Sequence, residues 1–179
     1  MKAAIYARVS DDKKKSDGDR RQDVNRQVDL IKQHILRMGI KGPKIAQIYI
    51  DDGKSAYTED WNCRQGFKQM FNDCRRYLVD QIFIEDMTRF SRRLDMGLKW
   101  LKELSDLNVN LTSLKEGELE VTSSKGWMQS SLLLMMAEWD SRVRSEKVRS
   151  GMMRAKAQGK RIGGRNPTPP ALNKSRAKK

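Results

Sequence analysis

Hydrophobic residues form short runs that alternate along the chain with longer amphipathic stretches. The runs at 3–9, 45–50, 81–84 and 109–114 are brief and mostly apolar, which is typical of strands buried on both faces of a sheet. Between them, apolar residues recur every three or four positions in 24–35, 67–74 and 94–104, which predicts amphipathic helices. This alternation predicts an α/β domain whose sheet is mainly parallel, has four to five strands and is flanked by helices.

Polar segments separate these elements. The stretch 11–19 is lysine-rich and contains Gly18, so we expect a loop there. The first helix is expected to end near Gly39, and Gly42-Pro43 predicts a turn before the second strand. A second long loop is predicted from Asp51 to Cys63.

The last third of the chain has a different pattern. Residues 127–157 contain no proline and a single glycine, which predicts one helix about 45 Å long. Methionine and leucine dominate its first half and lysine and arginine its second half. The apolar half fits either the domain core or a dimer interface. A basic extended arm follows, so we divide the chain into a catalytic-type domain (1–126), a long helix (127–158) and an arm with a tail (159–179).

Charge sharpens this division. The net charge is +14, but residues 1–140 hold 24 Lys and Arg against 22 Asp and Glu, whereas residues 141–179 hold 13 against one. A nearly neutral body with a basic C-terminal segment is typical of nucleic-acid binding. A solvated tail or a membrane-surface patch are the alternatives, and few apolar anchors follow Met153 to favour the membrane.

Composition also limits the cellular setting. No run approaches the roughly 18 apolar residues that span a bilayer, so we expect a cytoplasmic, DNA-associated protein with no membrane partner. Cys63 and Cys74 lie eleven residues apart and are interpreted as reduced thiols. We expect neither a metal nor another cofactor.

Candidate chemistry gathers where strands end. Ser10 closes the first apolar run, and the only histidine, His34, is distant in sequence, which disfavours a serine–histidine pair. Arginines cluster instead near the predicted strand ends, and guanidinium groups are well shaped to bind phosphate. The C-terminal ends of parallel strands meet at one edge, so Ser10 and four arginines are expected to form a phosphoryl-transfer site there: Arg8, Arg64, Arg89 and Arg92. The alternative is that Ser10 only closes a strand.

Five motifs in order resemble the serine recombinases, the family of resolvases, invertases and serine integrases. They are Tyr6-Ala7-Arg8-Val9-Ser10, Gln27 on the first helix, Asp51-Asp52-Gly53-Lys54-Ser55 followed by Arg64-Gln65-Gly66-Phe67, Thr88-Arg89-Phe90-Ser91-Arg92, and the long helix and arm from Ala137-Glu138 to Gly164-Arg165-Asn166-Pro167. The resemblance covers roughly residues 3–167.

The resemblance implies a resolvase-like catalytic fold and a metal-free mechanism. Ser10 would attack a DNA phosphodiester, leaving a 5′-phosphoserine and a free 3′-hydroxyl, while the four arginines hold the phosphate. Gln27 would orient the serine or a phosphate oxygen; without the resemblance it is equally a solvent-facing helix residue. Double-stranded DNA is the expected partner, and homodimers would pair into tetramers through the long helix. The DNA-binding candidates are Arg149, Arg154, Lys156, Lys160, Arg161 and Arg165.

The chain departs from the family pattern at two places. Thr88 stands where the signature has aspartate, and Asp86 could supply the carboxylate if it lies on the same side of an extended strand. Asp140-Ser141 stands where Glu-Arg is common, and Arg142 or Arg144 could replace that arginine. The catalytic candidates therefore include Asp86, Thr88, Arg142 and Arg144 as supporting residues.

Three functions remain open at this point. The first is a site-specific DNA recombinase, and the second is a catalytically impaired DNA-binding regulator on the same fold, which the departures at Thr88 and Ser141 favour. The third, a domain that binds nucleotides or signalling phosphates, is disfavoured because no glycine-rich loop follows the first strand. Only about a dozen residues follow Pro167, too few for a helix-turn-helix. We therefore expect either a fragment of a larger recombinase or binding by helix and arm alone.

Overall fold

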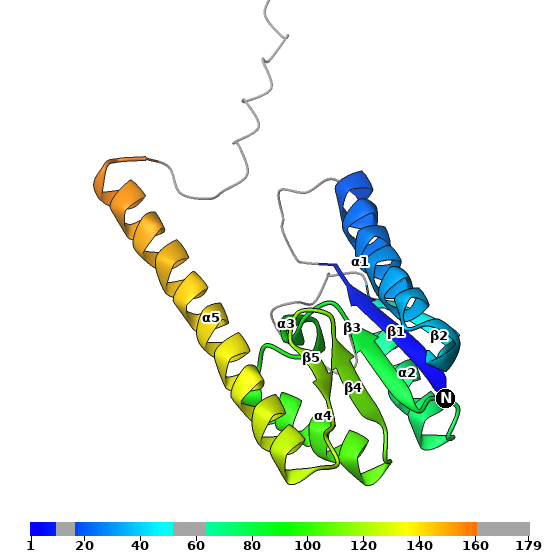
Figure 1. Ribbon diagram of the computed structural model, residues 1–179. Helices are drawn as coiled ribbons and strands as arrows, with labels where there is room; N and C mark the ends of the chain where they lie inside the picture. The colour runs from blue at the N-terminus through cyan, green and yellow to red at the C-terminus, as the bar shows by residue number, and fades with distance from the viewer. Residues whose placement is uncertain (10–16, 52–63, 161–179) are drawn as a thin grey trace, which may run out of the picture. The chain divides into compact units, whose positions relative to one another are not determined.

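The computed structural model of the chain describes residues 1–9, 17–51 and 64–160, which build a five-stranded sheet (Figure 1). The strands are β1 (Lys2–Arg8), β2 (Lys44–Asp51), β3 (Gln81–Ile84), β4 (Asn110–Ser113) and β5 (Gly117–Leu119), in the order β2-β1-β3-β4-β5. The first four pair in parallel and β5 runs antiparallel to β4. The predicted α/β class and mainly parallel sheet are confirmed.

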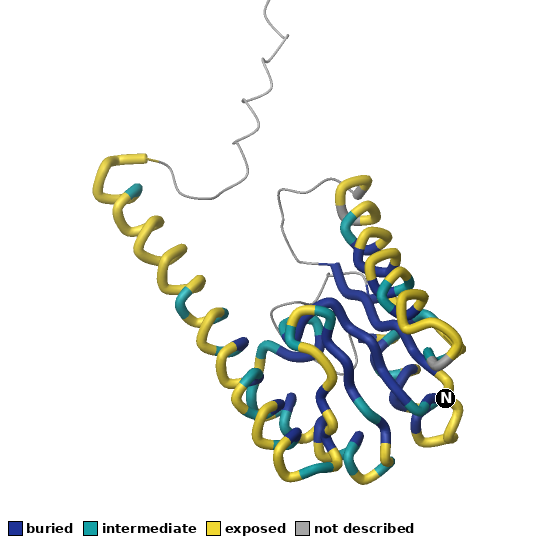
Figure 2. The backbone as a smooth tube through the Cα atoms, viewed as in Figure 1, coloured by how far each residue is buried: buried dark blue, intermediate teal, exposed yellow. Residues whose placement is uncertain are grey.

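Helices cover both faces of the sheet. They are α1 (Asp17–Arg37), α2 (Gln65–Arg75), α3 (Met87–Phe90), α4 (Leu94–Asp106) and α5 (Ser124–Ala157), with a short 3-10 helix, η1 (Gly39–Lys41), after α1. A hydrophobic cluster lies on each face of the sheet, and alternate residues of β1 point into one or the other. Ala3 and Ile5 pack with α1, whereas Ala4 and Tyr6 belong to the cluster formed with α2 and α4. Because both faces of β1 are covered, the strand is continuously buried (Figure 2).

Three details differ from the predicted elements. α1 begins at Asp17, so residues 17–19 are helical rather than part of the expected loop. α5 begins at Ser124, three residues earlier than predicted. β2 is largely exposed along its length because it lies at the edge of the sheet, although its apolar run resembles that of a central strand.

The N-terminal part of α5 belongs to the compact unit of residues 1–141. One stripe of this helix is buried, formed by Gly126, Ser130, Leu134 and Ala137. Gly97 of α4 leaves room for Leu134, since a Cβ at Gly97 would lie 2.8 Å from the Leu134 methyl groups. The Glu138 carboxylate accepts a hydrogen bond of 2.7 Å from the Leu94 N–H and so caps the start of α4.

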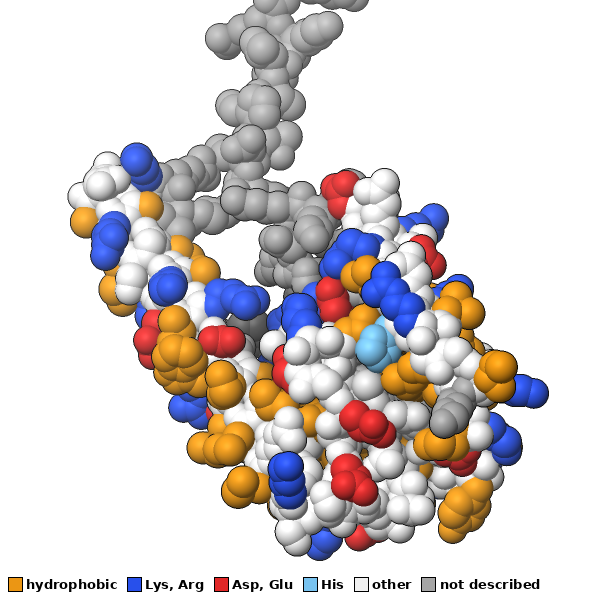
Figure 3. All heavy atoms as spheres, viewed as in Figure 1, with side chains coloured by type: hydrophobic (Ala, Val, Ile, Leu, Met, Phe, Trp, Pro, Cys, Tyr) orange, Lys and Arg blue, Asp and Glu red, His pale blue; other side chains and the backbone are white. Residues whose placement is uncertain are grey.

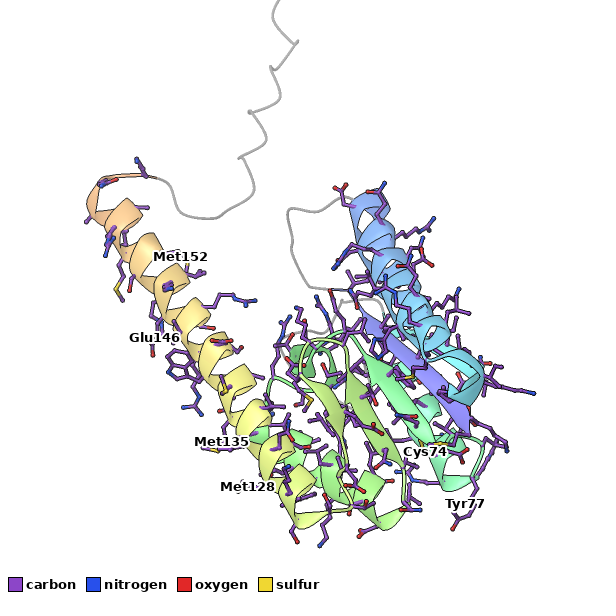
Figure 4. All side chains as sticks on the ribbon, viewed as in Figure 1. Cys74, Tyr77, Met128, Met135, Glu146 and Met152 are labelled. Atoms are coloured by element: carbon purple, nitrogen blue, oxygen red, sulfur yellow. The ribbon has the colours of Figure 1, made fainter. Side chains whose placement is uncertain are left out.

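The other face of the same stretch of α5 is exposed and apolar. Its large side chains are between 52% and 63% exposed: Met128, Leu132, Met135, Met136 and Trp139. Hydrophobic side chains gather there in Figure 3, and Figure 4 labels Met128 and Met135 on the side directed away from the sheet. The apolar half of the helix therefore contributes to the core along one stripe and leaves a second stripe uncovered.

Residues 142–179 form a separate unit, of which 142–160 are described. The helix continues to Ala157, and the basic side chains along this part are exposed: Arg142, Arg144, Lys147, Arg149, Arg154, Lys156 and Lys160. The division into 1–126, 127–158 and 159–179 stays a prediction. None of the helices in the described ranges has the length and hydropathy that crossing a membrane would require.

Candidate active site

Arginines from two elements converge on the backbone of α3 at the C-terminal edge of the sheet. The Arg8 guanidinium, at the end of β1, donates from Nη2 to the Thr88 carbonyl at 2.7 Å. Arg64, which immediately precedes α2, donates from Nη2 to the Arg89 carbonyl at 3.2 Å. Because Arg89 itself lies in α3, three of the four predicted site arginines are brought together.

Arg64 is 2% exposed and is held in an aromatic pocket. Its Cζ lies 3.7 Å from the centroid of the Phe67 ring and 4.9 Å from that of Trp100. A guanidinium over ring faces gains electrostatic and dispersion energy, which offsets part of its desolvation. The rings also fix the plane of the guanidinium, so Arg64 has a defined orientation.

A tyrosine and an aspartate complete the support of Arg64. The Tyr6 hydroxyl accepts hydrogen bonds from Arg64 Nη2 at 2.9 Å and Nε at 3.3 Å, and donates to Asp51 Oδ2 at 2.8 Å. Burial raises the pKa of Tyr6 well above its usual value, so the phenol keeps the proton that it donates. Asp51 also accepts from the N–H groups of Gly66 and Phe67 at 2.7 and 3.0 Å, which caps α2 from the end of β2.

Gln27 of α1 is fully buried against the end of β1. Its Oε1 accepts from the Arg8 N–H at 3.4 Å and its Nε2 donates to the Arg8 carbonyl at 3.2 Å. The amide thus binds both polar groups of the Arg8 backbone, two residues before Ser10 in sequence. The solvent-facing alternative for Gln27 is wrong, since this side chain forms part of the site's support.

Asp86 and Thr88 are in contact, but not along the extended strand that the sequence suggested. Asp86 has extended backbone angles and precedes α3, whereas Thr88 lies within that helix, so the two residues do not share one strand. The Thr88 hydroxyl donates to Asp86 Oδ1, and Lys115 Nζ donates to Asp86 Oδ2 at 2.8 Å. Burial alone would raise the pKa of Asp86, but the hydrogen bonds from Lys115 and Thr88, with the Arg89 charge, lower it overall.

A second buried carboxylate, that of Glu85, lies next to Asp86 in sequence and pairs with two arginines. Glu85 is 6% exposed, and its two oxygens accept from Arg26 Nη2 at 2.9 Å and from Arg89 Nη2 at 3.4 Å. Arg89 is therefore positioned by an acidic residue four positions earlier in the chain as well as by its own helix. Arg26 is half-exposed, and the hydrogen bond that it donates to Glu85 raises its pKa.

Two guanidinium atoms at the site keep unused hydrogen-bonding capacity. Arg64 Nη1 and Arg89 Nε are buried and have no hydrogen-bond acceptor within the described part of the chain. A buried donor without an acceptor is unfavourable by about 1–3 kcal/mol, so such atoms are rare in stable interiors. Both belong to residues that the sequence predicts to bind phosphate.

The remaining predicted residues lie in the connection after α3, in the second unit or outside the described residues. Arg92 lies in the connection between α3 and α4 and is partly buried. Arg142 and Arg144 lie in the second unit with the exposed residues Arg149, Arg154, Lys156 and Lys160. Ser10, Arg161 and Arg165 lie outside the described residues. Within the described ranges, His, Cys, Asp and Glu side chains form no group of three or more that could hold a metal ion.

Several supporting residues were not found by sequence reasoning. Tyr6 and Asp51 lie within sequence motifs that resemble the family, but neither was assigned a role, and Lys115 lies 29 residues from its partner Asp86. The sequence did contain a signal for each of the first two. Tyr6 places a polar hydroxyl inside a buried strand, and Asp51 places a carboxylate at a strand end. Glu85 precedes the arginine motif and gave a similar signal, whereas nothing local marks Lys115.

Comparisons with known proteins show the family of this chain. The sequence matches the family described as "Resolvase, N terminal domain" over residues 3–161. It is 28% identical over 134 residues to the serine recombinase PinR of Escherichia coli strain K12, covering 75% of this chain and 63% of PinR. The Tn2501 transposon resolvase of Escherichia coli is 29% identical over 110 residues, covering 62% of this chain and 54% of the resolvase. The chain thus spans less than two thirds of the length of either relative.

Solved structures share the fold. The N-terminal catalytic domain of TP901-1 integrase superposes with a TM-score of 0.59 at 21% identity, covering 80% of this chain and 99% of that domain. A resolvase family site-specific recombinase from Streptococcus pneumoniae gives a TM-score of 0.55 at 22% identity, covering 89% of this chain and 97% of that one. The long family match, with the buried arginines at the strand edge, shows that the chain belongs to the resolvase family of serine recombinases.

Proposed function

We propose that this chain is the catalytic part of a site-specific DNA recombinase that cuts and rejoins DNA through a phosphoserine formed by Ser10. The observation that carries the proposal is the convergence of Arg8 and Arg64 on the short helix that contains Arg89, with buried guanidinium donors that have no acceptor among the described residues. Ser10 follows Val9, whose N–H bonds to the Asp51 carbonyl at 3.1 Å, so the sheet pairing carries the chain to within one residue of the serine.

The proposed chemistry is a reversible exchange of phosphodiester bonds. The Ser10 oxygen forms a bond to phosphorus as the bond from phosphorus to the 3′-oxygen breaks; the serine loses its proton and the 3′-oxygen gains one. Charge grows on the phosphoryl oxygens in the transition state, where fixed guanidinium groups are most effective. The phosphoserine stores the bond energy, and attack by a 3′-hydroxyl reverses the step and rejoins DNA.

Arginine placement in the free protein favours this chemistry. Arg8 and Arg64 are each bound to a carbonyl of α3, and the aromatic rings hold Arg64 in plane, so little reorganisation is required when phosphate arrives. The Gln27 amide holds the Arg8 backbone through its N–H and carbonyl groups. In this proposal Arg92 is the fourth phosphate ligand, and Gln27 positions the end of β1.

DNA binding is assigned to the basic part of α5 and the arm that follows. The exposed residues Arg149, Arg154, Lys156 and Lys160 lie in this part, and Arg161 and Arg165 continue it in sequence. Exposed cations bind phosphates with affinity that depends steeply on salt and little on sequence. Arg142 and Arg144 lie in the same unit, and we assign them a supporting catalytic role in place of the arginine of the family's Glu-Arg pair.

Oligomerisation is assigned to the uncovered apolar stripe of α5. The stripe of Met128, Leu132, Met135, Met136 and Trp139 exposes contiguous hydrophobic surface along one helix face, which marks interaction sites. We propose that a second copy covers it to form the homodimer, and that dimers pair into a tetramer for strand exchange.

The test uses a supercoiled plasmid library that carries random sequence. Protein and DNA are mixed at low salt, quenched with denaturant and digested, and a covalent protein–DNA adduct is sought. We expect an adduct in the unaltered protein and in the control Ser105→Ala, but none in Ser10→Ala. DNA binding without any adduct would support the regulator instead, and failure to bind DNA would contradict both functions.

A further inference from the structure

Thr88 connects the candidate active site to an ion pair at its rim. Its carbonyl accepts the 2.7 Å hydrogen bond from Arg8, and its hydroxyl donates to the Asp86 carboxylate. The position of the Arg8 guanidinium therefore depends on how Thr88 is held. Thr88 replaces the aspartate of the family signature, so the charge at this point of the site resides on Asp86.

Asp86 is held in turn by Lys115. The Asp86 side chain is 9% exposed, and Lys115 Nζ lies 2.8 Å from Oδ2 while Thr88 occupies Oδ1. A buried carboxylate needs charge and hydrogen-bond donors to remain ionised, and Lys115 supplies both. Removing the ammonium would free Asp86 to turn or take up a proton, and Thr88 would lose its fixed partner.

Lys115 is well placed for this task because its own backbone is fixed. It follows β4 in the turn before β5, and its N–H donates to the Glu85 carbonyl at 3.2 Å. The neighbouring Leu114 N–H donates to the Ile84 carbonyl at 3.0 Å, which extends the pairing of β3 and β4 past the strand ends. The turn is thereby tied to the residues that precede α3.

We propose that Lys115 is a positioning residue that acts through Asp86 and Thr88 on Arg8. The chain of contacts runs from the ammonium to the carboxylate, to the threonine hydroxyl and, through the threonine carbonyl, to the guanidinium. This inference rests on the proposed function, because the importance of Arg8 is that of a phosphate ligand. It gives a task to a lysine that follows β4, the strand paired with β3, and that no sequence motif includes.

The alternative is that Lys115 binds a DNA phosphate directly, since its side chain is 60% exposed. The two roles predict different effects on DNA affinity and on cleavage rate when the Lys115 charge is removed. A phosphate ligand weakens DNA binding and lowers the salt slope by about one when it is removed. A positioning residue leaves binding and its salt dependence unchanged and slows cleavage.

The experiment combines single and double variants. Lys115→Ala should reduce the rate of Ser10-dependent adduct formation about tenfold, the lower end of what residues that orient functional side chains contribute. Lys115→Arg should restore most of the rate, and the exposed control Lys102→Ala should have no effect. In an Asp86→Asn background, Lys115→Ala should cause no further loss, because its partner charge is already gone.

A second measurement, by NMR, tests the contacts from Lys115 to Arg8 without relying on catalysis. The side-chain Nε–Hε NMR signal of Arg8, assigned with Arg8→Lys, should move in Lys115→Ala, return in Lys115→Arg and stay in place in Lys102→Ala. An unchanged Arg8 signal, weaker DNA binding in Lys115→Ala, or full additivity with Asp86→Asn would overturn the proposal. Absence of any adduct in the unaltered protein would count against the recombinase function, while the NMR signal would still decide the role of Lys115.

Discussion

Arginines occur in two different settings in this molecule, and the contrast separates their tasks. In the body, Arg8 and Arg64 are each 2% exposed and are bound to backbone carbonyls. In the second unit, Arg149 and Arg154 are exposed along the helix. Burial strengthens electrostatic interactions and fixes geometry, whereas solvent and salt weaken those of exposed charges. The first setting therefore suits transition-state chemistry and the second suits sequence-independent attraction to DNA.

Replacing a buried arginine should produce the largest effect on activity. Arg64→Lys keeps the charge but loses the planar fork that contacts Tyr6 and Arg89, so we expect adduct formation to fall by about 10²–10³-fold. DNA affinity should change little, because the exposed cations are intact. Single-turnover cleavage and a binding titration measure the two quantities. A loss of affinity as large as the loss of rate would break the contrast between the two settings.

Removing the support of Arg64 should mainly lower stability. Tyr6→Phe deletes the hydroxyl that accepts from Arg64 and donates to Asp51, leaving buried polar atoms without partners. The free energy of unfolding should fall by about 1–3 kcal/mol, measured by urea denaturation. Tyr77→Phe is the matched control, since the Tyr77 side chain is 72% exposed (labelled in Figure 4). Equal stability of the two variants would show that the buried hydroxyl contributes nothing.

Replacing an exposed arginine should have a smaller effect that depends on salt. Arg154→Gln should reduce the slope of log affinity against log salt by about one and weaken binding equally for all sequences. The cleavage rate of DNA already bound should not change. Lys102→Gln, an exposed lysine in the body, should leave the slope as it is. If Arg154→Gln left the salt slope unchanged, this part of α5 would not bind DNA phosphate.

The smallest expected effect is the pH dependence at Asp86. Its pKa in the folded protein is lowered, so its ionised form stabilises the fold at pH values above the ordinary aspartate pKa of about 3.9. That contribution is lost as the pH falls through the lowered pKa. Asp86→Asn should therefore be less stable than the unaltered protein at neutral pH, and the difference should vanish in acid. A difference that grows with acidity would contradict the lowered pKa.

Sequence periodicity predicted most of the body but missed its smallest elements. β5 has three residues of which one is buried, and α3 has four, so neither is long enough to show a period. The strand and helix order was recovered because each longer element carries its own apolar pattern. The edge position of β2 was not predictable from its composition, since exposure depends on the order of strands in the sheet.

The candidate site was predicted as a set of residues but not as a structure. Arg8 and Arg89 were identified from their positions near strand ends and Arg64 from the long loop after the second strand, and the fold brings them together at α3. What holds them was not predictable: Tyr6, Asp51 and Lys115 act through contacts between residues distant in sequence. Such contacts follow from the packing of the whole sheet, which a local pattern does not encode.

The unused donors on Arg64 and Arg89 also affect how the free protein responds to its solvent. Positive groups gathered at one edge, with buried hydrogen atoms that no described residue accepts, lower the stability of the free protein. A solute that binds only the folded state shifts the unfolding equilibrium by mass action. Sulfate or inorganic phosphate should therefore raise the temperature of unfolding more than chloride does at equal ionic strength. The choice of buffer anion thus becomes part of any measurement of this protein's stability.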